Sequence, residues 1–272
     1  MGHDHEGQRV SRRTALAGIG AVGLGAILAA CSESPTGGRT PTPVPTTGGG
    51  TATITPRATG PADLAALLEQ ARTCTLTPAT TQGPYYFDAG KIRSDIREDR
   101  EGVRLTLGIK VQDTETCAPL RDAVVEIWHC DAAGLYSGAE SLSRGGGGGP
   151  GDLTPLDDER YLRGAQVTGE DGIVRFTTIW PGWYPGRTVH IHAMVHISDQ
   201  RVLTTQVMFD EALNTKVLAA APYAARGGRD TFNDDDSIYQ DSMLLKLAED
   251  GDGYLGAIVF AADSADSDGG GS

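Results

Sequence analysis

Two histidines and two tyrosines are the side chains of this sequence best suited to chemistry at a metal ion. His190 and His192 lie two positions apart, and on a strand that spacing turns both imidazoles to one face, about 6–7 Å apart along the chain. Two imidazole nitrogens can then reach one metal ion. Tyr136 and Tyr184, upstream, could add two phenolate oxygens. Two nitrogens with two anionic oxygens suit oxidised iron better than zinc or copper, which points to oxygen chemistry.

The elements that must hold these residues are short strands separated by turn signals. Few segments after Cys74 are long enough for helices. We therefore predict an all-β fold, a β-sandwich with long loops and a short N-terminal helix at 63–73. Residues 143–151 contain five consecutive glycines and are predicted to form a flexible loop. The predicted strands cover 103–111, 123–129, 172–179, 188–197 and 203–209.

The N-terminal residues predict export rather than a folded element. Residues 1–31 contain a twin-arginine pattern around Arg12 and an apolar run too short to span a bilayer. The run ends at Cys31 in a sequence like a lipobox, so we predict lipid attachment there. An ordinary signal with an incidental cysteine is the alternative. We expect a cell-surface lipoprotein or an extracellular protein, bound to the membrane only through the lipid.

The amino-acid composition divides the rest of the chain into a linker, one folded domain and a tail. Residues 32–61 are rich in Pro, Thr and Gly and are predicted to be a disordered linker, as is the tail at 265–272. The segment 62–264 is long enough for one well-cored domain. The formal net charge of −13 argues against nucleic acid and other polyanionic partners.

The cysteines point to a disulfide rather than to a thiolate metal site, because the sequence contains no CxxC spacing. Outside the cytoplasm we expect one oxidised pair among the cysteines that follow Cys31. Cys117 lies in a predicted turn and Cys130 at the end of a predicted strand, which would hold the two apart. We therefore favour a Cys74–Cys117 disulfide, with Cys130 free and buried.

Residues 74 to about 260 resemble the intradiol ring-cleavage dioxygenases, non-haem iron(III) enzymes that open catechol-type rings between the two hydroxyls. The combination of motifs is specific, although His-Ile-His alone would not be. The matching stretches are QGPYY at 82–86, IWHCDAAGLYSG at 127–138, LRGAQ at 162–166, FTTIWPGWY at 176–184, RTVHIH at 187–192 and TQ at 205–206.

The resemblance implies a β-sandwich that holds one non-haem Fe(III) per chain between its sheets. It also implies that a catechol-type small aromatic and O₂ are the substrates and that a cis,cis-muconate-type diacid is the product. Tyr184 would be the ligand that leaves when substrate binds. Arg187 would stabilise negative charge on the substrate ring, and Gln206 would lie near that ring. The implied iron ligands are Tyr136, Tyr184, His190 and His192.

Several assignments stay open at the level of sequence. Tyr85, Tyr86, Trp180 and Trp183 are candidates for the substrate pocket, with core packing as the alternative for each. We interpret His129, on a predicted core strand, as a structural histidine. A homo-oligomer is compatible with the sequence. The alternative function is a non-catalytic, surface-anchored β-sandwich that binds metal, carbohydrate or protein.

Overall fold

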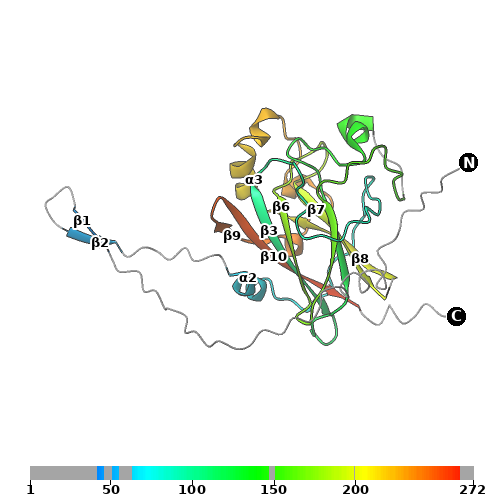
Figure 1. The fold of residues 1–272 in the computed structure, drawn as a ribbon, viewed down its shortest axis with the longest axis horizontal. Helices are drawn as coiled ribbons and strands as arrows, with labels where there is room; N and C mark the ends of the chain where they lie inside the picture. The colour runs from blue at the N-terminus through cyan, green and yellow to red at the C-terminus, as the bar shows by residue number, and fades with distance from the viewer. Residues whose placement is uncertain (1–41, 46–50, 55–62, 147–150, 199, 264–272) are drawn as a thin grey trace, which may run out of the picture.

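The computed structural model describes residues 42–45, 51–54, 63–146, 151–198 and 200–263 (Figure 1). The predicted signal with Cys31 and the predicted tail lie outside the described residues, as does most of the predicted linker. Within the linker, β1 (Thr42–Pro45) and β2 (Thr51–Ile54) pair antiparallel with each other, which the composition did not predict.

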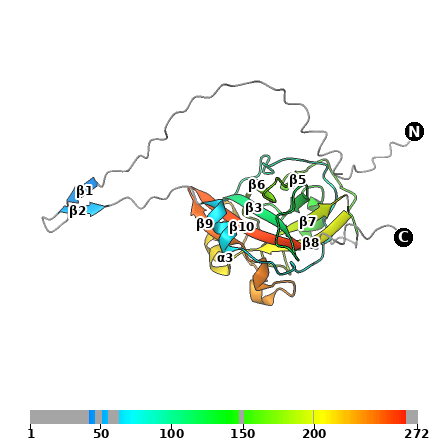
Figure 2. The ribbon, with the colours of Figure 1, turned by 90° about the horizontal axis from the view of Figure 1, so that it is seen from below.

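The domain is built from two four-stranded sheets, which confirms the predicted all-β sandwich (Figures 1 and 2). The first sheet has the order β6-β3-β10-β9, with β10 parallel to β3. Its strands are β3 (Arg104–Asp113), β6 (Ile173–Ile179), β9 (Lys246–Asp250) and β10 (Gly253–Ala262). The second sheet is antiparallel, with the order β5-β4-β7-β8. Its strands are β4 (Val124–Trp128), β5 (Arg163–Val167), β7 (His190–Ile197) and β8 (Gln200–Met208).

The main hydrophobic core lies between the two sheets. Leu107 of the first sheet and Ile127 and Ile191 of the second are completely buried in this one cluster. Because side chains alternate across a strand, the neighbours of Ile191 on β7 must point away from this core. Those neighbours are His190 and His192.

A short helix, α2 (Leu64–Gln70), covers the outer face of the first sheet (Figure 2). The Asp63 carboxylate accepts a hydrogen bond from the N–H of Ala65 and so caps the helix, while leucines of α2 pack on β10. The helix ends at Gln70, earlier than predicted. None of the helices in the described part of the chain has the length and apolar character to cross a membrane.

Other helical elements were not predicted. The α-helix α3 (Glu211–Leu218) begins after Asp210, whose side chain accepts from the N–H of Leu213. The prediction of a flexible loop at 143–151 is wrong for its first four residues, because 143–146 belong to the π-helical turn η1. Residues 147–150 lie outside the described residues. The short helical turns are η1 (Leu142–Gly146), η2 (Tyr223–Ala225), η3 (Asn233–Asp235) and η4 (Asp241–Met243).

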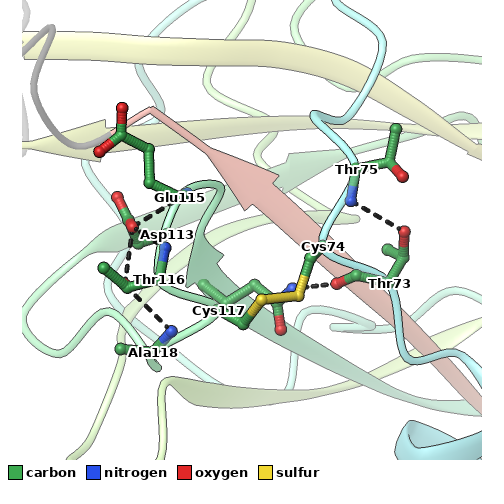
Figure 3. The surroundings of a disulfide bond; sticks show 9 residues. Thr73, Cys74, Thr75, Asp113, Glu115, Thr116, Cys117 and Ala118 are labelled. Atoms are coloured by element: carbon green, nitrogen blue, oxygen red, sulfur yellow. Dashed lines mark hydrogen bonds between the residues drawn. A yellow bond between two sulfur atoms is a disulfide. The ribbon is translucent and has the colours of Figure 1, made fainter.

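A disulfide joins Cys74 to Cys117, the pairing favoured from the sequence (Figure 3). It links the segment after α2 to the turn that follows β3. The Asp113 carboxylate stabilises that turn by accepting from the N–H groups of Glu115 and Thr116. Cys130 is free and buried.

Candidate metal centre

The two histidines lie on the outer face of the second sheet. The expectation of a site between the sheets is therefore wrong, because Ile191 and Ala193 fill the inter-sheet core at the alternate positions of β7. The outer face is covered instead by loop residues, Tyr85 and Tyr136 among them, which form a second buried cluster. The site is thus enclosed between a rigid sheet and the loops that cross it.

The imidazoles of His190 and His192 converge, with 3.1 Å between their Nε2 atoms. The Nδ1–H of His190 donates to the carbonyl of Thr188 at 2.6 Å, so the neutral ring carries its lone pair on Nε2. His192 stacks on Trp128, its partner across the strands, with ring centroids 5.0 Å apart and an angle of 4°. Both rings are therefore oriented before any metal binds.

Both tyrosines reach the same place from loops. The hydroxyl of Tyr184 lies 3.1 Å from Nε2 of His190. Tyr136 is completely buried, and its ring centroid is 5.8 Å from that of Tyr184. Its hydroxyl has no hydrogen-bond partner among the described residues. A buried polar atom without a partner is costly, which indicates that a bound group completes the site.

Burial sets the ionisation of the four groups in the absence of a metal. It raises the pKa of Tyr136 and of Tyr184 well above their usual range. It lowers the pKa of His190 to about 3, aided by the charge of Arg187, and lowers that of His192 well below its usual value. At neutral pH these four side chains on their own are uncharged, and the imidazoles are already in the neutral form that binds a metal ion.

These residues fit a ferric ion. A trivalent cation favours the phenolate form and so counteracts the effect of burial on both tyrosines. Among the described residues, no group of three or more His, Cys, Asp or Glu side chains could hold a metal ion. A metal at this position would therefore depend on the tyrosine oxygens, which favours hard, oxidised iron.

Arg187 and Gln206 lie beside the four residues and contact each other. The Nη2 of Arg187 donates to Oε1 of Gln206, which is the strand partner of His192. On its other side, Nε of Arg187 donates to Oδ2 of Asp236 at 2.9 Å. The Arg187 side chain is only 16% exposed and the Asp236 side chain only 1%, so this pair is fixed in place.

A pocket of about 610 Å³ opens beside Tyr184. Of the four residues predicted to line it, Tyr85 does so, with its ring centroid 6.3 Å from that of Tyr184. The described residues that line the pocket are Tyr85, Ala133, Leu135, Ser143, Arg144, Tyr184, Pro185 and Arg226.

The other three predicted pocket residues do not line it. Tyr86 is buried, and its hydroxyl donates to the carboxylate of Glu126. Trp180 lies in the inter-sheet core, where its Nε1 donates to Asn214. Trp183 also packs in that core, behind the guanidinium of Arg226, which lies 4.0 Å from its ring centroid. Core packing, the alternative left open by the sequence, describes both tryptophans.

The structure adds residues that the sequence did not single out. Asp236 ends a run of acidic residues, and nothing in the sequence separates it from its exposed neighbours. Arg144 and Arg226 reach the pocket from distant segments without a motif. Gly83 did carry a signal, since it lies in the QGPYY stretch. It has a φ of +71°, and a Cβ there would lie 3.0 Å from Cε1 of His192.

Comparison with known proteins agrees with this arrangement. A family model described as "Dioxygenase" matches residues 81–228, more than half of the chain. Catechol 1,2-dioxygenase 1 of Acinetobacter lwoffii is 29% identical over 153 residues, which cover 48% of this chain and 45% of that protein. Hydroxyquinol 1,2-dioxygenase of Corynebacterium glutamicum is also 29% identical, over 155 residues that cover 49% and 46%. The chain thus matches about half the length of these relatives.

Solved structures extend the match over most of the described domain. An intradiol ring-cleavage dioxygenase from Tetranychus urticae is 35% identical, with a TM-score of 0.66, and covers 70% of this chain and 95% of that one. The dioxygenase domain of a dioxygenase carbohydrate-binding protein fusion from Streptomyces sp. SirexAA-E is 27% identical, with a TM-score of 0.51, covering 70% and 99%. The chain belongs to the intradiol ring-cleavage dioxygenase family.

Proposed function

We propose that this protein is a non-haem Fe(III) dioxygenase that cleaves catechol-type rings between the two hydroxyls with O₂ and yields cis,cis-muconate-type diacids. The observation that carries the proposal is the convergence of two imidazoles and two phenols in one buried place, with Nε2 of His190 3.1 Å from both Nε2 of His192 and the hydroxyl of Tyr184. When bound by these residues and Tyr136, ferric iron would bind the substrate oxygens and withdraw electron density from the ring.

Tyr184 is the ligand candidate that faces the substrate. It lines the pocket, whereas Tyr136 is completely buried. In its ionised form the Tyr184 oxygen can accept a proton from the hydroxyl of an entering catechol. Tyr136, His190 and His192 would stay in place, because the sheet and the covering loops leave them no room to move.

Arg187 supplies positive charge beside these groups. Asp236 and Gln206 hold its guanidinium, so the charge is oriented before substrate enters. A preorganised charge of this kind stabilises negative charge that develops on the substrate ring. The apolar and aromatic lining around Tyr85 and Leu135 would exclude water from the ring.

The test is the colour and oxygen consumption of iron-loaded protein. We expect a visible tyrosinate-to-iron band, one O₂ consumed per ring cleaved, and a diacid product. Tyr136→Phe and Tyr184→Phe should shift or abolish the band and the turnover. Tyr254→Phe removes a hydroxyl on β10, in the sheet that does not carry the histidines, and should keep both. A colourless protein that binds stoichiometric zinc and consumes no O₂ would contradict the proposal and favour a binding module.

Export and lipid attachment are a separate part of the proposal. They rest on the twin-arginine and lipobox-like patterns that end at Cys31. We expect the full chain to fractionate with membranes in a bacterium that has both pathways. Cys31→Ser should release it into the soluble fraction. Membrane association of that variant would contradict lipid attachment at this cysteine.

A further inference from the structure

A row of four buried side chains crosses the second sheet on the face that carries the histidines. Backbone pairing across β5, β4, β7 and β8 places in this row Arg163, Trp128, His192 and Gln206. Paired residues of neighbouring strands turn their side chains to the same face of a sheet. The row therefore runs from the candidate metal centre to Arg163, which is only 1% exposed and has no part in the proposed function.

The Arg163 guanidinium is held between the two loops that cover the site. Its Nη2 donates to the carbonyls of Tyr85 and Ser137, at 2.8 and 2.9 Å. Its Nε donates to Oγ of Ser137 at 2.9 Å, and its Cζ lies 4.0 Å from the ring centroid of Phe87. Since Ser137 follows Tyr136 in the chain, these contacts fix the backbone beside a ligand candidate.

The positive charge of Arg163 lacks a close negative partner. Among the described residues no carboxylate forms an ion pair with it, and its Nη1 is buried without a hydrogen-bond partner. Glu126 is near enough to act on this charge, but burial raises the pKa of Glu126 to about 8, so the carboxyl group is mainly uncharged at neutral pH. Burial lowers the pKa of Arg163 only to about 10, so the guanidinium stays charged. A buried charge without a counter-charge is unfavourable.

Tyr136 can supply the missing counter-charge. The Cζ of Arg163 lies 6.0 Å from the Tyr136 ring centroid. Like Nη1 of Arg163, the Tyr136 hydroxyl is buried and has no hydrogen-bond partner in the described part of the chain. Binding to a trivalent ion turns the phenol into a phenolate. His192 lies two strands from Arg163, about 10 Å across the sheet, so the guanidinium acts more strongly on the phenolate than on an ion beside the imidazoles.

We propose that Arg163 is a positioning residue of the candidate metal centre, and that its charge stabilises the phenolate of Tyr136 and so sets the electronic properties of the bound iron. This inference rests on the proposed function, because the phenolate forms when the iron binds. Arg163 acts through Tyr136, since it is not among the described residues that line the pocket beside Tyr184.

The experiment compares the iron-loaded full chain with its Arg163→Gln and Arg163→Lys variants. A cation near the phenolate lowers the energy of its electrons, so loss of the charge should move the tyrosinate-to-iron band to longer wavelength. The ratio of Fe(III) to Fe(II) at a fixed potential should rise roughly ten-fold, as expected for loss of one unit charge acting over about 10 Å at an effective dielectric constant of about 20. Arg163→Lys keeps the charge and should stay close to the parent protein in both measurements.

Arg104→Gln is the matched control. Arg104 is a partly buried arginine on β3, in the sheet that does not carry the histidines, and it pairs with Asp250. Its loss should change neither the band nor the ratio. If Arg163 only tied the two loops together, Arg163→Gln and Arg163→Lys would affect the band alike. Equal shifts in these two variants, or an unmoved band in folded Arg163→Gln, would overturn the inference.

A pH titration tests the inference even where Arg163→Gln does not fold. A buried lysine loses its proton at a lower pH than an exposed one, so the band of Arg163→Lys should move to longer wavelength between about pH 7 and 9. The parent band should not follow, because a guanidinium keeps its proton. The same pH dependence in both proteins would overturn the inference. A colourless parent would contradict the proposed function as well, whereas a coloured parent with unshifted variants would contradict this inference alone.

Discussion

One oxygen of Asp236, Oδ2, accepts hydrogen bonds from Nε of Arg187 and from the backbone N–H of Thr188, each at 2.9 Å. Its other oxygen accepts from the N–H of Ile238. The carboxylate therefore fixes both the Arg187 side chain and the backbone that leads into His190. Although burial alone would raise the pKa of Asp236, these hydrogen bonds and the Arg187 charge lower it, so the group is ionised at neutral pH.

The first prediction concerns this positioning. Asp236→Asn keeps the shape but removes the charge that orients Arg187, and we expect kcat to fall roughly ten- to hundred-fold, as expected for a misplaced electrostatic group. Iron content and the visible band should persist, since Asp236 contacts none of the four ligand candidates. Asp235→Asn, at an exposed neighbouring position, is the matched control. Equal kcat in both variants would show that Asp236 has no positioning role.

The second prediction uses two glycines of one loop. Gly83 and Gly90 both have positive φ, at +71° and +60°, but a Cβ at Gly83 would press on the His192 ring, whereas nothing lies within 4 Å of one at Gly90. Each Ala substitution should lower the free energy of unfolding by about 1 kcal/mol for the backbone conformation. Only Gly83→Ala should also weaken iron binding, which titration of the visible band measures. Equal iron affinity in the two variants would mean that the His192 ring can move away from the added methyl group without weakening iron binding.

The alternation of apolar and polar residues along a strand made much of the fold predictable. The strands β3 and β6 alternate over part of their length between buried and less buried side chains, and β7 turns alternate residues to the inter-sheet core and to the covered outer face. The predictions over 103–111, 172–179 and 188–197 fell on these three strands. The strand β10 is buried along its whole length, because one face meets the inter-sheet core and the other meets α2. A continuous apolar run carries no period of two, so β10 was not predicted. Its neighbour β9 was not predicted either, because it is short, mostly polar and without a clear alternation of apolar residues.

The sequence was enough to name the ligand candidates of the site, but not to predict where in the fold they lie. The spacing of His190 and His192 on one strand fixes a common face from the sequence alone. Which face that is depends on which alternate residues fill the core, and only the structure shows that Ile191 and Ala193 do. Asp236 and Arg226 reach the site through tertiary contacts, for which no local pattern exists.

The third prediction concerns acid stability. His129 is completely buried, with Nδ1 hydrogen-bonded to the carbonyl of Cys130 and Nε2 to the hydroxyl of Thr178, which agrees with a structural histidine. Burial, with a smaller contribution from the Arg163 charge, lowers its pKa to about 4. Protons therefore bind the unfolded chain more readily. The stability that the neutral ring provides is complete above pH about 6.5 and is lost as the pH falls towards about 4.

Over that interval the loss from His129 alone should be about 3 kcal/mol, at about 1.4 kcal/mol per pKa unit. We expect His129→Gln to flatten the dependence of the unfolding free energy on pH between pH 6.5 and 4, as measured by urea titrations of metal-free protein. The residual slope combines His190 and His192, which act in the same direction, with the buried Glu126, whose pKa burial raises to about 8 and which acts in the opposite direction. A variant with the full slope of the parent would show that His129 is not neutral in the folded protein.

The last prediction concerns the Cys74–Cys117 disulfide, which closes a loop with a sequence separation of 43. Chain-entropy estimates give about 4 kcal/mol for a loop of that length, because the bond restricts the unfolded chain. The loop contains Gly83, Tyr85 and all of β3. Loss of the disulfide should therefore loosen the segment that covers the candidate metal centre as well as lower stability. We expect the double substitution of both cysteines by serine to lower the urea midpoint strongly, and dithiothreitol to do the same to the parent protein. Cys130→Ser, at the buried free thiol, should leave the response to dithiothreitol intact. If dithiothreitol destabilised the double variant as much as the parent, the stabilising bond would have to involve another cysteine.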